Sequence, residues 1–225
     1  MIYRFPIKTV KDMLLNQIGN NYFKSIEDEA LITKHLPKAV ERFEKCIEGS
    51  TNKYYSRINE RGDREPYFDP LHTCQWALFL YFMANTIYKY EDKRKDAARV
   101  VCDKIYGQAK TISGSDIYYE VEMPDKFYFD YPLGSHIGRA KFGDEFSFVQ
   151  GCTVDDKDGK YPVIGKKVTM LAGSKIIGNS YIGNNCIISE GTIIVDENIG
   201  DDSIVSGKSP YLTIEPINAK IGGTK

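Results

Sequence analysis

Residues 129–138, FDYPLGSHIG, contain a side chain suited to proton transfer. His136 is one of only 3 histidines in the 225-residue chain, and histidine is the usual general base because its ordinary pKa lies near neutrality. Tyr131 precedes it in the same stretch. A tyrosine hydroxyl has an ordinary pKa of about 10, so it is a poor base but a serviceable hydrogen-bond donor. His136 is therefore either a general base or a surface histidine without a chemical role.

The other two histidines lie in the first half of the chain. His72 follows Asp69 near the predicted start of an apolar helix, where it is either a core residue with satisfied hydrogen bonds or part of a ligand pocket. We expect His35 to lie in a surface segment.

The second half of the chain has an apolar residue at every sixth position. The register runs through Ile164, Met170, Ile176, Ile182, Ile188 and Ile194, and small residues stand four positions after the first five of these: Val168, Ser174, Ser180, Cys186 and Thr192. A step of six fits neither an ordinary helix nor a hairpin strand. It predicts coils with three flat faces, in which the aliphatic residue points inward and successive coils stack as parallel strands. The alternative is an antiparallel sheet with chance spacing.

The first half has a helical pattern. Residues 37–48 place Val40, Phe43 and Ile47 at spacings of three and four, which predicts an amphipathic helix. Residues 70–89 predict a buried helix with Pro70 in its first turn and Asp69 as its cap, and residues 92–110 predict another amphipathic helix. Residues 49–68, including an RGD triplet, are predicted to be a loop. We thus expect an α+β chain with an α-helical domain over 1–112, a parallel β-helix over 113–210 and a C-terminal tail over 211–225.

Composition excludes several classes of function. The chain has 30 Lys+Arg and 31 Asp+Glu, a net charge of −1, which gives no electrostatic reason to expect nucleic acid or an anionic membrane as a partner. The longest apolar run, 77–84, is far shorter than the ~20 residues of a membrane span, and no secretory signal is visible at the start. Five scattered cysteines favour reduced thiols over a disulfide framework or a metal site. We expect a cytoplasmic protein.

The repeat resembles the hexapeptide repeat of the left-handed parallel β-helix. The combination of a helical N-terminal domain with this repeat resembles the serine acetyltransferase family. Three stretches carry the resemblance: SDIYYEVEMPDKFYFDYPLGSHIG (115–138), GCTVDDKDGKYPVIG (151–165) and TMLAGSKIIGNSYIG (169–183). It extends from about residue 69 to 206, and the DPLH…Q…FLY pattern is similar to a branch found in bacterial surface-polysaccharide clusters. The resemblance implies acetyl-CoA as co-substrate, a small-molecule acceptor, and a homotrimer or dimer of trimers.

The resemblance also assigns catalytic roles. Asp116 falls on the carboxylate that orients the catalytic imidazole, while Tyr131 falls on the catalytic histidine itself. His136 is then the substitute base, with His72 as the other candidate.

Acceptor binding is implied for a further set of positions. Asp69 and Asp130 fall on acceptor-binding acids, Tyr161 falls on a second family histidine, and Lys160 falls on the arginine before it; His72 could line the same pocket. Asp155 and Asp156 replace a Gly-Gly pair, and we interpret them as a solvated loop tip. Positions beside the family's CoA groove are Gly173, Ser174, Lys175, Gly191 and Lys208.

Three functional hypotheses follow. The first is an O-acetyltransferase that moves an acetyl group from acetyl-CoA to serine or a sugar hydroxyl. The second is a catalytically inactive trimeric binding or assembly protein on the same fold, since tyrosine stands at both family histidines. The third is a sugar N-acetyltransferase, because an amine acceptor needs less base catalysis. None of them calls for a metal.

Overall fold

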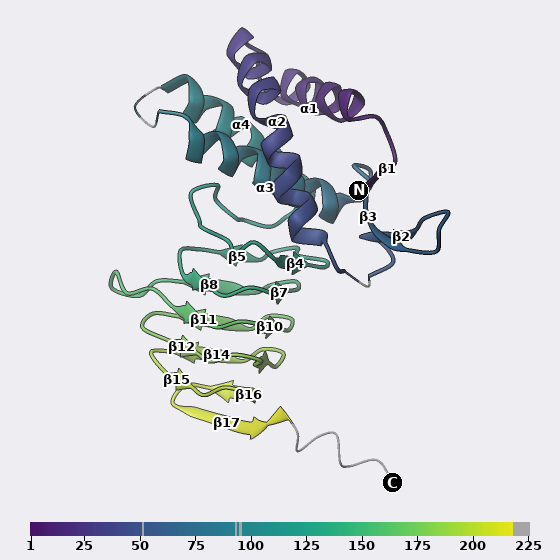
Figure 1. Ribbon diagram of the computed structural model, residues 1–225. Coiled ribbons are helices and arrows are strands. Elements are labelled where there is room, and N and C mark those ends of the chain that lie inside the picture. The colour runs from purple at the N-terminus through teal and green to yellow at the C-terminus, as the bar shows by residue number, and fades with distance from the viewer. Residues whose placement is uncertain (51, 93, 95, 218–225) are drawn as a thin grey trace. The chain divides into compact units, whose positions relative to one another are not determined.

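The chain folds into two compact units, Met1–Ser113 and Gly114–Lys225 (Figure 1). The structure is a computed structural model that describes residues 1–50, 52–92, 94 and 96–217. The first unit is mainly helical, whereas the second is built of short strands. Each unit has its own core and is described separately.

Four helices form most of the first unit. Helix α3 is apolar on all sides and contacts both α2 and α4, so it forms the centre of this core. Helix α2 begins with a capping box, in which Ser25 and Asp28 each accept a hydrogen bond from the other's backbone N–H; this satisfies two of the donors that a helix start leaves open. The helices are α1 (Ile7–Asn21), α2 (Ile26–Ile47), α3 (Thr73–Tyr90) and α4 (Asp96–Ser113).

Two local predictions for this unit are wrong. Helix α3 begins at Thr73 with His72 as its cap. Asp69 instead closes a turn before the helix, since its Oδ1 accepts a hydrogen bond from the backbone N–H of Leu71. The stretch predicted to be a loop contains two strands of an antiparallel hairpin with the RGD triplet at its turn. The strands are β2 (Ser56–Ile58) and β3 (Arg64–Phe68), and β1 (Ile2–Tyr3) pairs parallel with β3.

His35 is buried, which corrects its predicted surface position. Its Nε2 lies 2.6 Å from Oε1 of Glu91, which also pairs with Lys34. Hydrogen bonds from Lys34 and His35 lower the pKa of the Glu91 carboxyl below its ordinary value. The histidine therefore fastens α2 to the segment just after α3, and its position reflects packing.

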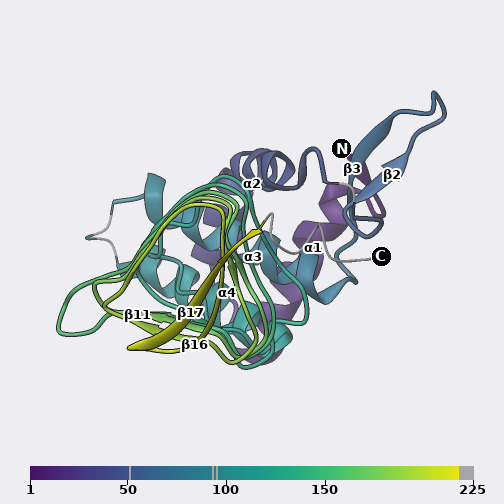
Figure 2. The same cartoon turned by 90° about the horizontal axis from the view of Figure 1, so that it is seen from below.

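The second unit is a three-sided prism of stacked coils with parallel strands, which Figure 2 shows in projection. The first face has β4 (Phe127–Phe129), β7 (Phe146–Phe148), β10 (Thr169–Met170), β13 (Ile187–Ile188) and the first part of β16 (Ser203–Lys208). The second has β5 (His136–Ile137), β8 (Thr153–Asp155), β11 (Lys175–Ile177) and β14 (Ile193–Val195), next to the end of β16. The third has β6 (Lys141–Phe142), β9 (Val163–Ile164), β12 (Tyr181–Ile182) and β15 (Asn198–Ile199).

The inward positions of this prism are those that the step of six predicts. All six aliphatic residues of the register and all five small residues between them are buried. Met170 pairs with Ile188 on the next coil, so one full turn takes 18 residues in the regular part. Because the strands are parallel, the antiparallel alternative is excluded, and the predicted α+β architecture with a left-handed parallel β-helix of about 5 turns is confirmed.

The step of six is shortened to five between the inward Ile194 and Ile199, and it is lengthened between β8 and β9. The inward Ile176 is followed by the inward Ile182, six positions on, whereas Val154 is followed by Ile164, ten positions on. Four extra residues therefore bulge from this corner, and we call residues 155–162 the insert loop. Its ends stay in register because Val154 pairs with Ile176 and Ile164 pairs with Ile182.

The last coil is closed by a strand that runs the other way. Strand β17 (Tyr211–Pro216) pairs antiparallel with β16. The first residues of the predicted C-terminal tail therefore cover the edge of the sheet, while residues 218–225 of that tail lie outside the described residues.

Adjacent isoleucines in β13 test this alternation of inward and outward side chains. Ile188 is fully buried, while Ile187 lies on the outer surface and is half-buried. We predict that Ile188→Ala lowers the free energy of unfolding by about 2–5 kcal/mol because it leaves a cavity, and that Ile187→Ala costs far less. Urea unfolding followed by circular dichroism measures both. Equal costs for the two variants would contradict the assigned register.

Candidate active site

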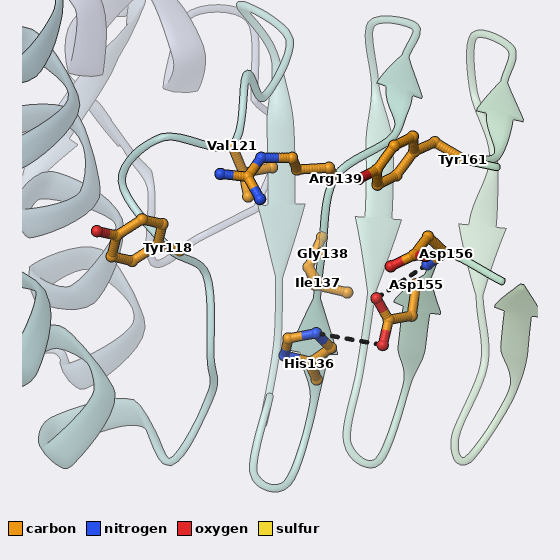
Figure 3. Close-up of a pocket in the computed structure, with 9 residues that line it drawn as sticks. All are labelled: Tyr118, Val121, His136, Ile137, Gly138, Arg139, Asp155, Asp156 and Tyr161. Carbon is orange, nitrogen blue, oxygen red and sulfur yellow. Dashed lines mark hydrogen bonds and ion pairs between the residues drawn. The ribbon is translucent and has the colours of Figure 1, made fainter. Parts of the chain in front are cut away.

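A pocket with a cavity of about 150 Å³ lies on the prism where the insert loop leaves the second face (Figure 3). The imidazole of His136 and the carboxylates of Asp155 and Asp156 gather there. Tyr118, Val121 and Arg139 line one side, Tyr161 lines another, and the backbone of Ile137 and Gly138 forms the floor between them. The pocket is thus built entirely within the second unit.

The fold places His136 beside Asp116. The two residues form a parallel bridge: the N–H of Asp116 donates to the carbonyl of Ser135 at 2.8 Å, and the N–H of Ile137 donates to the carbonyl of Asp116 at 2.9 Å. This pairing brings His136 Nδ1 within 3.6 Å of Asp116 Oδ2. A carboxylate at one ring nitrogen orients an imidazole and stabilises the imidazolium that forms when the ring accepts a proton.

A second carboxylate lies at the other ring nitrogen. Asp155 Oδ2 is 3.8 Å from His136 Nε2, and Figure 3 shows its side chain directed at the ring. Both side chains are nearly half exposed, so Nε2 is open to the pocket. At this separation one small molecule can place two neighbouring donor groups within hydrogen-bond reach, about 2.6–3.2 Å, one of Nε2 and the other of Oδ2.

An ion pair fastens the insert loop to the residue after β14, two coils further along the prism. Lys157 Nζ lies 2.5 Å from Asp196 Oδ2, and Asp196 Oδ1 accepts a hydrogen bond from the backbone N–H of Asn179. This ion pair lowers the pKa of the Asp196 carboxyl and raises the pKa of the Lys157 ammonium group. Gly178 leaves room for this contact, because a Cβ there would lie 2.3 Å from Asp196 Oδ1. The loop that carries Asp155, Asp156 and Tyr161 is thereby held against the prism.

The parallel register also aligns a row of outward side chains below His136. His136 pairs with Thr153, Thr153 with Lys175, Lys175 with Ile193, and Ile193 with Lys208. Since strands are about 4.8 Å apart, Lys175 lies two steps and Lys208 four steps from the imidazole, about 10 and 19 Å. Their two ammonium groups are therefore spaced along one straight face that leads away from the pocket.

The structure brings some of the predicted site residues together and leaves others apart. His136 and Tyr161 line the pocket, and Asp116 contacts the imidazole of His136 without lining the pocket itself. Tyr131 does not line it; this residue sits at a coil corner with a φ of 49° and a side chain that is 78% exposed. Asp130 is exposed at the same corner, and Lys160 is an exposed residue of the insert loop that pairs with the backbone of Lys157.

Two predicted residues lie in the helical unit. Asp69 forms an ion pair with Arg4 at 2.7 Å. His72 caps α3, where its Nδ1 accepts a hydrogen bond from the backbone N–H of Gln75 and its ring packs against Tyr54. These contacts match the interpretation of His72 as a structural histidine with satisfied hydrogen bonds.

The small residues predicted beside a CoA groove lie at one edge of the second face. Gly173 and Gly191 occupy stacked corners with φ values of 71° and 67°. The N–H of Gly173 donates to the carbonyl of Gln150, and the N–H of Gly191 donates to the carbonyl of Ala172. Ser174 is fully buried inside the prism. Its hydroxyl therefore faces the core, where it lies 3.7 Å from Sγ of Cys152, and it cannot serve a surface groove.

Sequence reasoning missed part of the pocket. Asp155 and Asp156 were interpreted as a solvated loop tip, whereas both line the pocket, as do Tyr118 and Arg139. The available signal was the ten-residue gap between the inward positions Val154 and Ile164, which marks where the chain must leave the coil.

Within the described residues, no group of three or more His, Cys, Asp or Glu side chains could hold a metal ion. Over the same part of the chain, no helix has the length and apolar character needed to cross a membrane.

Sequence comparison gives serine acetyltransferases as relatives, and no family model matches the chain. The serine acetyltransferase of Staphylococcus epidermidis is 28% identical over 151 residues, which cover 64% of this chain and 63% of that protein. That of Staphylococcus xylosus is 26% identical and also covers 64% of this chain, with 62% of its own length matched. The chain thus spans a little less than two thirds of the length of these curated relatives.

Solved structures share the fold over almost the whole chain. The crystal structure of serine acetyltransferase from Brucella abortus strain S19 has a TM-score of 0.70 at 20% identity and covers 95% of this chain and 84% of its own. The same enzyme in complex with coenzyme A gives 0.68 at 17%, covering 95% and 83%. The Neisseria gonorrhoeae serine acetyltransferase gives 0.67 at 18%, covering 98% and 85%. This chain therefore has a serine acetyltransferase-like hexapeptide-repeat β-helix fold, as the resemblance implied.

The Lys157–Asp196 pair gives a testable property of the insert loop. We predict that Lys157→Met speeds amide hydrogen exchange over residues 157–161, while Lys166→Met, which alters an exposed lysine outside the loop, does not. Because pairing lowers the pKa of Asp196, the wild-type protection is kept as the pH falls to the ordinary aspartate value of about 3.9 and is lost only below it. Unchanged exchange in Lys157→Met would show that the pair does not hold the loop.

Proposed function

We propose that the chain is an acetyl-CoA-dependent acetyltransferase that acetylates a hydroxyl of a small-molecule acceptor, with His136 as general base. The observation that carries this proposal is the imidazole between Asp116 and Asp155, at the mouth of a pocket on a fold shared with serine acetyltransferases. A crystal structure with coenzyme A exists for one of those enzymes, which supports the same donor here.

The proposed reaction needs two proton transfers, one to the imidazole of His136 and one from it. The acceptor oxygen loses its proton to Nε2 of His136 as it forms a bond to the acetyl carbon, and the bond from that carbon to sulfur breaks. Asp116 stabilises the imidazolium at Nδ1, and the proton then passes from the ring to the leaving thiolate. Asp155 accepts a hydrogen bond from a second donor group of the acceptor molecule and thereby fixes its position. Tyr131 has no part in this scheme, since its side chain lies outside the pocket.

The acetyl donor, acetyl-CoA, is proposed to bind along the row of outward side chains on the second face. Lys175 and Lys208 supply positive charge for phosphate groups at two distances from His136. Thr153 lies between His136 and Lys175, and Ile193 lies between the two lysines. Charge-assisted hydrogen bonds from ammonium to phosphate are among the stronger polar contacts in proteins. Gly173 and Gly191 at the edge of this face leave space for a chain to approach the backbone. A homotrimer, or a dimer of trimers, is the assembly proposed from the resemblance.

A catalytically inactive binding or assembly protein is the second candidate. The exposed Tyr131 favours it, because this position corresponds to the histidine on which the family depends. Under this proposal the chain still binds coenzyme A but releases no thiol with any acceptor. The third candidate, an N-acetyltransferase for amino sugars, differs only in the atom that is acetylated.

Replacement of the proposed base is the direct test of the reaction. We predict that His136→Asn lowers kcat for thiol release from acetyl-CoA by about 10²–10⁴-fold, the usual contribution of a general base. Tyr131→Phe keeps most of the activity, because this side chain lies outside the pocket. Thiol release is followed with a chromogenic disulfide reagent. Loss of activity in Tyr131→Phe with full activity in His136→Asn would reverse the assignment, and no release by the wild type would favour the inactive protein.

The proposed binding of acetyl-CoA to this row of side chains is tested by a substitution at Lys175. We predict that Lys175→Met raises KM for acetyl-CoA about tenfold and leaves kcat nearly unchanged, because it removes a contact made equally in the ground and transition states. Lys166→Met, at an exposed corner of the prism, is the control and leaves both constants unchanged. Initial rates at varied acetyl-CoA concentration measure the effect. A KM equal to that of the wild type would remove this face from donor binding.

A further inference from the structure

The charges that line the pocket limit the acceptors that it can hold. Asp155 and Asp156 are lining residues, and Asp116 lies directly behind the imidazole. The cation among the lining residues is Arg139, whose guanidinium is paired with Glu120 Oε2 at 3.0 Å. The pocket therefore has an excess of negative charge, and a carboxylate on an acceptor would be repelled by it.

The lysines of the insert loop do not reverse this balance. Lys157 is held by Asp196 at 2.5 Å. Lys160, which falls on an acceptor-binding arginine of the family by resemblance, is exposed and is absent from the residues that line the pocket. An amino acid such as serine carries a carboxylate that requires a cation, and the two lysines closest in sequence to the pocket residues do not supply it.

The same pocket offers the contacts that a polyhydroxylated ring requires. Carboxylate oxygens are hydrogen-bond acceptors only, so Asp155 and Asp156 suit the hydroxyl donors of a sugar. Tyr118 and Tyr161 stand on different sides of the pocket in Figure 3. Each gives an apolar ring face with a polar tip, which can pack against the C–H face of a sugar. Between them, Asp155 Oδ2 and His136 Nε2 lie 3.8 Å apart, so His136 can accept the proton of the reacting hydroxyl while Asp155 accepts a hydrogen bond from a neighbouring hydroxyl of the same ring.

From these charges and contacts we infer that the acceptor is a sugar ring without an anionic group, and not an amino acid with a free carboxylate. This inference rests on the proposed function, because it assigns the acceptor of the same pocket. Both a neutral hexose and a cationic amino sugar are sugar rings without an anionic group. They differ in the atom that becomes acetylated.

Two matched pairs of compounds test the effect of charge. Methyl glucoside and methyl glucuronide share one ring and differ in a carboxylate, while L-serine methyl ester and L-serine differ in the same way. We expect the member of each pair that lacks the carboxylate to have a kcat/KM roughly tenfold or more higher, because the pocket carboxylates repel a like charge. Methyl glucoside should also exceed L-serine. Asp155→Asn should reduce the discrimination between methyl glucoside and methyl glucuronide, with folding checked by circular dichroism.

Binding is measured separately from turnover by saturation-transfer NMR with methyl glucoside, glucosamine, methyl glucuronide and L-serine. Binding of methyl glucoside or glucosamine in preference to methyl glucuronide and L-serine supports the inference even when no thiol is released, a result that would overturn the proposed function alone. Thiol release with L-serine as the best acceptor, or equal binding of the glucoside and glucuronide, would overturn the inference and leave the acetyltransferase intact. Failure of all four compounds to bind would overturn the inference as well. Acetylated products of glucosamine, identified by mass spectrometry, distinguish the amine from the hydroxyl as acceptor.

Discussion

The inward aliphatic residues at every sixth position are the constraint on which the rest of this site depends. Their burial forces each coil to lie directly over the previous one, so that Ile176 pairs with Val154 on one side and with Ile194 on the other. A shift of one residue would turn every inward side chain outward. The outward residues are therefore aligned in rows as strictly as the core, and the row that begins at His136 is a consequence of packing.

The proposed active site lies where this regularity is interrupted. Four extra residues between Val154 and Ile164 lengthen the insert loop, which carries Asp156 and Tyr161 to the pocket. Asp155, the last residue of β8, lies near the imidazole because β8 pairs in parallel with β5. The Lys157–Asp196 pair then limits the freedom that the insertion introduces. A rigid scaffold with one fastened irregular segment suits the proposed site, in which a base and a carboxylate contact the same acceptor molecule.

Much of the fold could be predicted from the sequence because its signals are local and periodic. The step of six identified the inward face residue by residue, and the spacing of Val40, Phe43 and Ile47 identified a helix. The start of α3 was misplaced because Asp69 satisfies a turn just before the helix, a role that resembles a cap in sequence. The hairpin over Ser56–Phe68 was missed because its strands are short, charged and partly exposed.

The site was less predictable because it depends on contacts between residues distant in sequence. The proximity of His136 to Asp155 follows from the stacking of β8 on β5, and no local pattern of residue types encodes it.

The direct measurement of the proposed site is a crystal structure of the chain with bound coenzyme A. We predict that the thiol lies at the His136 end of the second face, within hydrogen-bond reach or one water of the imidazole, and that the phosphates lie near Lys175 or Lys208. Coenzyme A on another face, with its thiol remote from His136, would contradict this prediction.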